Sequence, residues 1–124
     1  MVRKNQKILF MVIKTERKKL SSARVRVLAR KLKKNLLQEG MPVRELFLFG
    51  SYATGRPHLD SDIDVAVIVP SGMTVREQKK AQQITWLTKQ TNVKFEPHIF
   101  SERDFNNRWL SLPAEIKKHG VKIR

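Results

Sequence analysis

The 124-residue chain contains no cysteine, no long hydrophobic run and few acidic residues. Without cysteine, neither a disulfide framework nor a thiolate metal site can form. A protein without disulfides is typical of a reducing compartment, so we expect a cytoplasmic protein. The hydrophobic run near the N-terminus, residues 8–13, is too short to span a bilayer, and no small-residue cleavage site follows it. We therefore expect neither a membrane anchor nor a signal peptide.

The scarcity of acids leaves a formal net charge of +15, and most of this charge lies in the N-terminal third. Residues 1–39 contain thirteen lysines and arginines against two glutamates, whereas the rest of the chain has thirteen against nine acids. Such a concentration of positive charge favours a nucleic acid, a nucleotide or an acidic protein as partner. A helix face that is merely exposed to solvent has the same composition, so the charge pattern alone does not distinguish a binding surface from an ordinary solvated surface.

The length is that of one domain, and hydrophobic spacing divides it into helices and strands. Apolar residues three and four apart predict an amphipathic helix from residue 21 or 22 to 39, which Gly40 and Pro42 end. Capping patterns that start at Thr74 and Ser101 predict two further helices. These two helices are expected to end near residues 90 and 110. The other predicted elements are strands over residues 43–49, 63–69 and 93–100, a short helix over 51–55, and a last helical segment over 113–119.

This order of elements predicts a small α/β (α+β) domain with a mixed sheet of three to four strands and helices packed mainly on one face. We expect the domain over residues 21–124, after a basic segment over residues 1–20. Pro97 restricts the third strand to a free edge or to a bulge after Glu96. Trp86 and Trp109 are expected in the core, because both lie on apolar helix faces.

The stretch LFLFGSYATGRPHLDSDIDVAVIV, residues 46–69, carries the strongest functional signal. An apolar strand runs into Gly50-Ser51, where a turn that enters a helix offers free backbone N–H groups to phosphates. Asp62 and Asp64 begin the next strand and project from one face, about 6.5 to 7 Å apart. Carboxylates of this kind are ligands for hard cations such as Mg²⁺, and the combination indicates phosphoryl or nucleotidyl transfer.

Each part of this pattern also has an ordinary structural explanation. A Gly-Ser after a strand is common in plain turns, and two aspartates can occupy a solvated strand end. Glu96, one strand later, is either a third catalytic acid or a charged residue on the exposed side of an edge strand. His58, His98 and His119 show no metal-ligand spacing, so we expect surface or hydrogen-bonded histidines.

Together, the Gly-Ser turn, the Asp-x-Asp strand and the acid on the following strand resemble the nucleotidyltransferase superfamily of DNA polymerase beta, kanamycin nucleotidyltransferase and the tRNA CCA-adding enzymes. The length is closest to the minimal nucleotidyltransferases, and the resemblance covers roughly residue 22 to the end, including the closing KKHGVKIR. It implies the nucleotidyltransferase fold and the transfer of a nucleoside monophosphate, with AMP from ATP as the expected case.

The resemblance also implies a role for each motif residue. Gly50 and Ser51 would bind the β- and γ-phosphates, while Asp62 and Asp64 would hold two Mg²⁺ ions. Glu96 would complete the second metal site and help to deprotonate the acceptor hydroxyl. Many minimal members read Gly-Ser-Tyr-Ala-Arg-Gly at the turn, whereas this chain has a threonine, Thr54, in place of the arginine. Either Arg56 takes over as the phosphate clamp, or the triphosphate is held less tightly.

Larger relatives carry a second domain for the acceptor, and a chain of this length has no room for one. The resemblance therefore implies a partner, and minimal nucleotidyltransferases are often paired with a helical HEPN protein in toxin–antitoxin systems. Two other possibilities remain: a nonenzymatic module that binds nucleic acid or a partner through its basic helix, and an antitoxin that acts by occlusion alone. The sequence leaves the nucleotide, the acceptor and homo-oligomer formation open.

Overall fold

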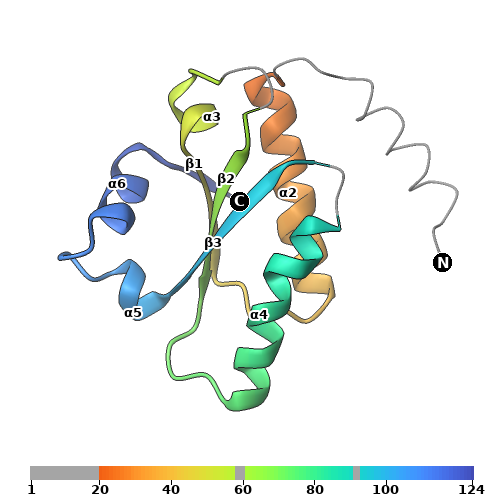
Figure 1. The fold of residues 1–124 in the computed structure, drawn as a ribbon, viewed down its shortest axis with the longest axis vertical. Coiled ribbons are helices and arrows are strands. Elements are labelled where there is room, and N and C mark those ends of the chain that lie inside the picture. The colour runs from red at the N-terminus through yellow and green to blue at the C-terminus, as the bar shows by residue number, and fades with distance from the viewer. Residues whose placement is uncertain (1–19, 58–60, 91–92) are drawn as a thin grey trace, which may run out of the picture.

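The protein forms a four-stranded mixed sheet with helices on both faces, seen in a computed structural model that describes residues 20–57, 61–90 and 93–124 (Figure 1). The strand order is β3-β2-β1-β4, in which β2 and β3 are parallel and β1 is antiparallel to both β2 and β4. The elements in chain order are α2 (Ser22–Gln38), β1 (Glu45–Phe49), α3 (Ser51–Thr54), β2 (Ile63–Val69), α4 (Val75–Lys89), β3 (Phe95–Ser101), α5 (Glu102–Phe105), α6 (Ser111–His119) and β4 (Val121–Ile123).

These elements confirm the predicted mixed sheet of three to four strands, and the strand that the sequence did not locate is β4 at the edge of the sheet. The expected basic segment over residues 1–20 lies almost wholly outside the described residues. Among the helices of the described ranges, none combines the length and the apolar character needed to cross a membrane.

Capping hydrogen bonds define both ends of helix α2. The Ser21 hydroxyl caps its N-terminus by accepting a hydrogen bond from the Arg24 N–H at 3.1 Å. At the other end Gly40 adopts φ 80°, and the N–H of Met41 donates to the carbonyl of Leu36, which is the hydrogen bond of a Schellman motif. The helix is therefore confirmed to within a residue of its predicted bounds.

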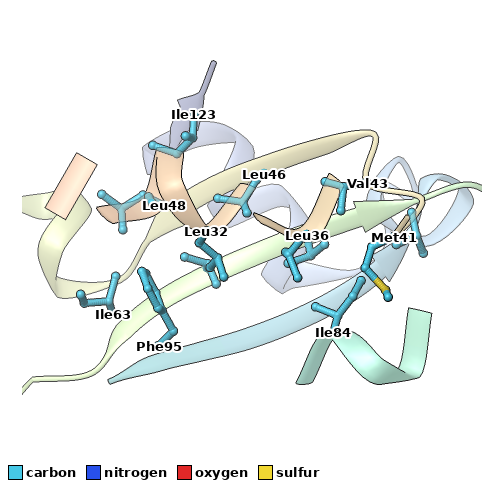
Figure 2. Packing of buried hydrophobic residues seen from close by; sticks show 14 of the residues in the cluster. Leu32, Leu36, Met41, Val43, Leu46, Leu48, Ile63, Ile84, Phe95 and Ile123 are labelled. Atoms are coloured by element: carbon cyan, nitrogen blue, oxygen red, sulfur yellow. The ribbon is translucent and has the colours of Figure 1, made fainter. Parts of the chain in front are cut away.

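The two long helices, α2 and α4, pack on one face of the sheet and form the main core (Figure 1). Figure 2 shows Leu32 and Leu36 of α2 and Ile84 of α4 directed towards strand residues such as Leu46 and Ile63. The two short helices, α5 and α6, cover part of the opposite face, where Phe105 and Ile116 pack against Ala66 and Ile68 of β2. Strand β2 is buried from both sides, as its continuous apolar run predicts.

Both tryptophans contradict the sequence-based expectation of a core position. Trp86 is 62% exposed and Trp109 is 81% exposed. On α4 the buried positions are Ala81, Ile84 and Thr88, so Trp86 projects to the side of the helix away from the sheet. Trp109 is exposed because α5 ends at Phe105 instead of continuing to about residue 110, which leaves the tryptophan in the connection to α6.

Strand β3 resolves the alternatives that its proline left open. Pro97 lies opposite Val65 in an uninterrupted parallel register from Phe95 to Ser101, so there is no bulge at this place. Among the described strands it pairs with β2 alone and lies at the edge of the sheet, where a residue without an N–H is tolerated.

Candidate active site

Gly50 connects β1 to α3 in a conformation that favours glycine. Its φ is 75° and its ψ is −153°, and its carbonyl accepts hydrogen bonds from the N–H groups of Ala53 and Thr54, both at 3.1 Å. A second constraint comes from Asp64: a Cβ built on Gly50 would lie only 2.3 Å from Asp64 Oδ2. Glycine is therefore required for the left-handed φ and also for the close approach of this turn to the carboxylate.

Strand register explains why the two halves of the motif meet. In the antiparallel pair β1–β2, Phe49 lies opposite Asp64, so the chain reaches Gly50 just beside that aspartate. In the parallel pair β2–β3, Asp64 lies opposite Glu96. Asp64 is thus central, with the Gly-Ser turn on one side and the third predicted acid on the other.

The other two acids are more open to solvent than Asp64. Asp62 precedes the first residue of β2 and is exposed, and Glu96 is exposed on the edge strand. Asp64 is half-buried, with 29% of its side chain exposed. Within the part of the chain that the structure describes, no group of three or more histidine, cysteine, aspartate or glutamate side chains is gathered closely enough to hold a metal.

Burial raises the pKa of the Asp64 carboxyl, and the negative charges of Asp62 and Glu96 raise it further. Contact with His98 acts in the opposite direction and lowers this pKa. The net rise shows that the folded protein disfavours the ionised form of Asp64. A divalent cation would relieve this repulsion, and carboxylate oxygens are the donors that Mg²⁺ prefers, so the donor chemistry of Asp64 suits such an ion, although the acids of the described residues do not gather into a closed set of ligands.

His98 differs from what the sequence indicates. It was expected to be a surface or hydrogen-bonded histidine, yet its Nε2 atom is buried without a hydrogen-bond partner, 3.5 Å from Asp64 Oδ1. By contrast His119 is an exposed neighbour of Glu115 on α6, as expected, and His58 lies outside the described residues. Histidine spacing could not find His98, because only the parallel register of β3 brings it near Asp64.

On the turn, the Thr54 side chain is already hydrogen-bonded within the protein, whereas the Arg56 side chain is exposed and could contact a ligand. The Thr54 hydroxyl is 3.3 Å from the carbonyls of both Gly50 and Ser51, to which it donates within α3. Arg56 follows Gly55 and is exposed, with its backbone N–H donating to the Ser51 carbonyl at 2.9 Å. Only Arg56 therefore offers a cationic side chain on this turn.

Gly50→Ala is expected to destabilise the protein more than Gly55→Ala, although φ is positive at both glycines, 75° and 76°. Backbone strain also differs, because Gly55 has ψ 18° and lies in the left-handed region, where alanine costs about 1 to 2 kcal/mol, whereas Gly50 has ψ −153° and lies in a region that is essentially restricted to glycine. Only at Gly50 does an added Cβ meet Asp64, whereas one at Gly55 meets nothing within 4 Å. Urea unfolding measures the difference, and adding Asp64→Ala to Gly50→Ala should remove the part that the contact with Asp64 causes. Equal losses for the two glycine variants would contradict the close approach.

Asp64→Asn is expected to stabilise the metal-free protein at pH 7, because the fold disfavours the ionised carboxyl. The folded-state pKa of Asp64 lies above its ordinary value of 3.8, so the favourable contribution of the protonated form is fully present below that value. It is lost as the pH rises through the folded-state pKa. Urea unfolding in EDTA should therefore show a gain at pH 7 that shrinks towards pH 3.5. A variant that is less stable than wild type at pH 7 would refute this account of the electrostatics.

Comparison with known proteins places the chain in a family. The family model for the nucleotidyltransferase domain matches residues 29–123. None of the curated proteins with which the chain was compared matches it.

Solved structures of similar fold were also found. A Sulfolobus solfataricus protein assigned to the nucleotidyltransferases is 20% identical, with 85% of this chain and 87% of that chain covered and a TM-score of 0.47. A toxin–antitoxin structure with AMP-PNP gives 20% identity, coverage of 77% and 72%, and a TM-score of 0.48. A complex of tri-AMPylated HEPN toxin from Shewanella oneidensis with MNT antitoxin gives 18% identity, coverage of 80% and 71%, and a TM-score of 0.44.

Likenesses this distant carry no substrate, partner or residue role to the present chain. The family match is different in kind, because it spans most of the sequence and includes the Gly-Ser turn, the Asp-x-Asp strand and Glu96. The protein belongs to the nucleotidyltransferase domain family.

Proposed function

We propose that this protein is a Mg²⁺-dependent nucleotidyltransferase that transfers AMP from ATP to a hydroxyl group of a partner protein. The observation that carries the proposal is the contact between the two halves of the motif: the Gly50 backbone lies directly against the Asp64 carboxylate. A phosphate bound at the Gly-Ser turn would therefore lie next to an acid that can hold its metal ion.

Gly50 and Ser51 would bind the triphosphate. The first N–H groups of a helix have no acceptor within the helix, so those that open α3 are available to the β- and γ-phosphates, and the Ser51 hydroxyl adds a donor. Arg56, exposed on the same turn, would contribute a positive charge in place of the arginine that Thr54 replaces.

Asp62, Asp64 and Glu96 would hold two Mg²⁺ ions together with phosphate oxygens. When bound, these ions supply polarisation of the α-phosphate and neutralise the charge of the departing pyrophosphate. Glu96 is exposed beside Asp64 and would accept the proton of the attacking hydroxyl, whose oxygen then displaces pyrophosphate in line.

The acceptor would come from another protein. The described residues form one sheet and its covering helices, which we assign to a single domain over residues 21–124 with a basic segment, 1–20, before it. By the resemblance of the motif to the minimal nucleotidyltransferases, we propose a helical HEPN-type toxin as partner and an antitoxin role for this chain. The cytoplasmic location stays a prediction from the absence of cysteine.

Label transfer tests the reaction. With Mg²⁺ and α-labelled ATP, label should appear on the partner protein, and Asp64→Asn or Glu96→Gln should lower the rate by about 100-fold or more. Glu115→Gln changes an exposed acid on α6 that pairs with His119 and is not part of the motif, and it should leave the rate unchanged. Comparing the four labelled NTPs identifies the nucleotide. If no NTP labels a folded partner, or if Asp64→Asn is as active as wild type, the enzymatic proposal fails.

The two turn residues give a second prediction. Arg56→Ala should weaken ATP binding by about 10-fold, because a charge-assisted hydrogen bond to phosphate is lost. Thr54→Arg in that background should restore much of the affinity, since it returns the cation to the position that many minimal members use. The Kd for a fluorescent ATP analogue measures both effects. Unchanged affinity in Arg56→Ala would remove Arg56 from the site.

A second candidate function, binding of nucleic acid, is favoured by the surface of α2. This helix has no acidic residue between Ser22 and Gln38 and exposes Arg24, Arg26, Arg30, Lys31 and Lys34. If these side chains contact phosphates, log Kd for a labelled RNA should change linearly with log salt concentration, and each Lys or Arg changed to Gln should reduce the slope by nearly one. Binding that salt does not affect would exclude this function.

A further inference from the structure

We infer that His98 is a positioning residue for Asp64: its Nε2–H donates to Asp64 Oδ1 and holds the carboxylate in the orientation that metal binding needs. This inference rests on the proposed function, because it concerns how a proposed metal ligand is held. His98 is not part of the sequence motif, and its spacing in the sequence does not indicate that it lies near Asp64.

The sheet register brings His98 to this place. His98 lies opposite Ala66, two residues along the strands from the Asp64–Glu96 pair. Residues paired in register project from the same face, and so do residues two apart on one strand, so His98 shares a face with both Asp64 and Glu96. Ala66 carries only a methyl group, which leaves room above β2 for the imidazole to reach Asp64.

The imidazole is supported on a second strand by Phe49. Their rings make an edge contact, with centroids 5.0 Å apart and an interplanar angle of 66°. Phe49 is itself the partner of Asp64 across β1 and β2. The histidine ring therefore extends from the edge strand over Ala66 to β1, and its direction is limited by packing before any ligand binds.

The Nε2 atom of His98 lies near a carboxylate oxygen that can accept a hydrogen bond from it. Nε2 is buried and has no hydrogen-bond partner, which is an unfavourable state for a polar atom. Asp64 Oδ1 is 3.5 Å away, whereas a well-formed hydrogen bond measures about 2.7 to 3.2 Å. A displacement of a few tenths of an ångström would form it, and such contacts often shorten when a site is loaded.

The two oxygens of Asp64 face different neighbours. Oδ2 is the atom against the Gly50 backbone, at the proposed phosphate turn, and Oδ1 is the atom near His98. A hydrogen bond to Oδ1 would stop the carboxylate from rotating and keep Oδ2 at the turn. Metal-binding carboxylates are commonly held by such outer hydrogen bonds, whose loss lowers metal affinity by about 10- to 100-fold.

Two substitutions separate positioning from packing. His98→Gln keeps an N–H donor at a reach similar to Nε2, whereas His98→Leu keeps the volume without a donor. Mn²⁺ affinity of the full chain with a nonhydrolysable ATP analogue, measured by electron paramagnetic resonance, is the main readout. We expect His98→Leu to weaken Mn²⁺ binding by about 10- to 100-fold and His98→Gln to stay within about threefold of wild type. Thermal unfolding in EDTA shows whether either variant is folded.

Each outcome decides the matter. Mn²⁺ binding by His98→Leu as tight as wild type, or equal weakening in both variants, would overturn the inference while leaving the proposed function intact. The same holds if the two variants differ only in thermal stability. If wild type with nucleotide binds no Mn²⁺ and Asp64→Asn changes nothing, the proposed function itself fails and this inference fails with it.

Discussion

The contact between the Gly50 backbone and the Asp64 carboxylate is the constraint on which the candidate site depends. A side chain at position 50 would lie inside the space of Asp64 Oδ2, so the turn and the acid can be neighbours only because the turn contains a glycine. This contact converts two motifs, separated along the chain, into one site where a phosphate and its metal ion could be bound together.

The rest of the fold holds this contact in place. Strand β2 is buried on both faces, by α2 and α4 on one side and by α5 and α6 on the other, so a one-residue slip of its register would be strongly disfavoured. Its pairing with β1 places Asp64 beside the turn, and its pairing with β3 places Glu96 beside Asp64. The partial burial of Asp64 raises its pKa and costs stability, which is common at functional sites.

Features with local causes could be predicted from the sequence. The ends of α2 and the start of α4 follow from Ser21, Gly40 and the Thr74–Glu77 capping box, and β2 matches its predicted bounds. The sequence pattern assigned the Gly50-Ser51 turn and Asp64 to one function, and in the structure Gly50 lies against the Asp64 carboxylate. The catalytic and binding roles of these residues stay predictions.

Features with nonlocal causes could not be predicted. Helix periodicity alone placed Trp86 in the core, but the sheet lies on the other side of α4. The position of His98 near Asp64 depends on the parallel register of β3 and on the small side chain of Ala66, neither of which sequence spacing reveals. The strand order and the early end of α5 likewise depend on tertiary packing.

A crystal structure of the protein with Mg²⁺ and a nonhydrolysable ATP analogue tests the central claim most directly. The account predicts that the β- and γ-phosphates lie against the backbone of Gly50 and Ser51, and that a Mg²⁺ ion joins them to Asp64. A triphosphate bound away from this turn, or an Asp64 carboxylate that contacts no metal in that complex, would contradict it.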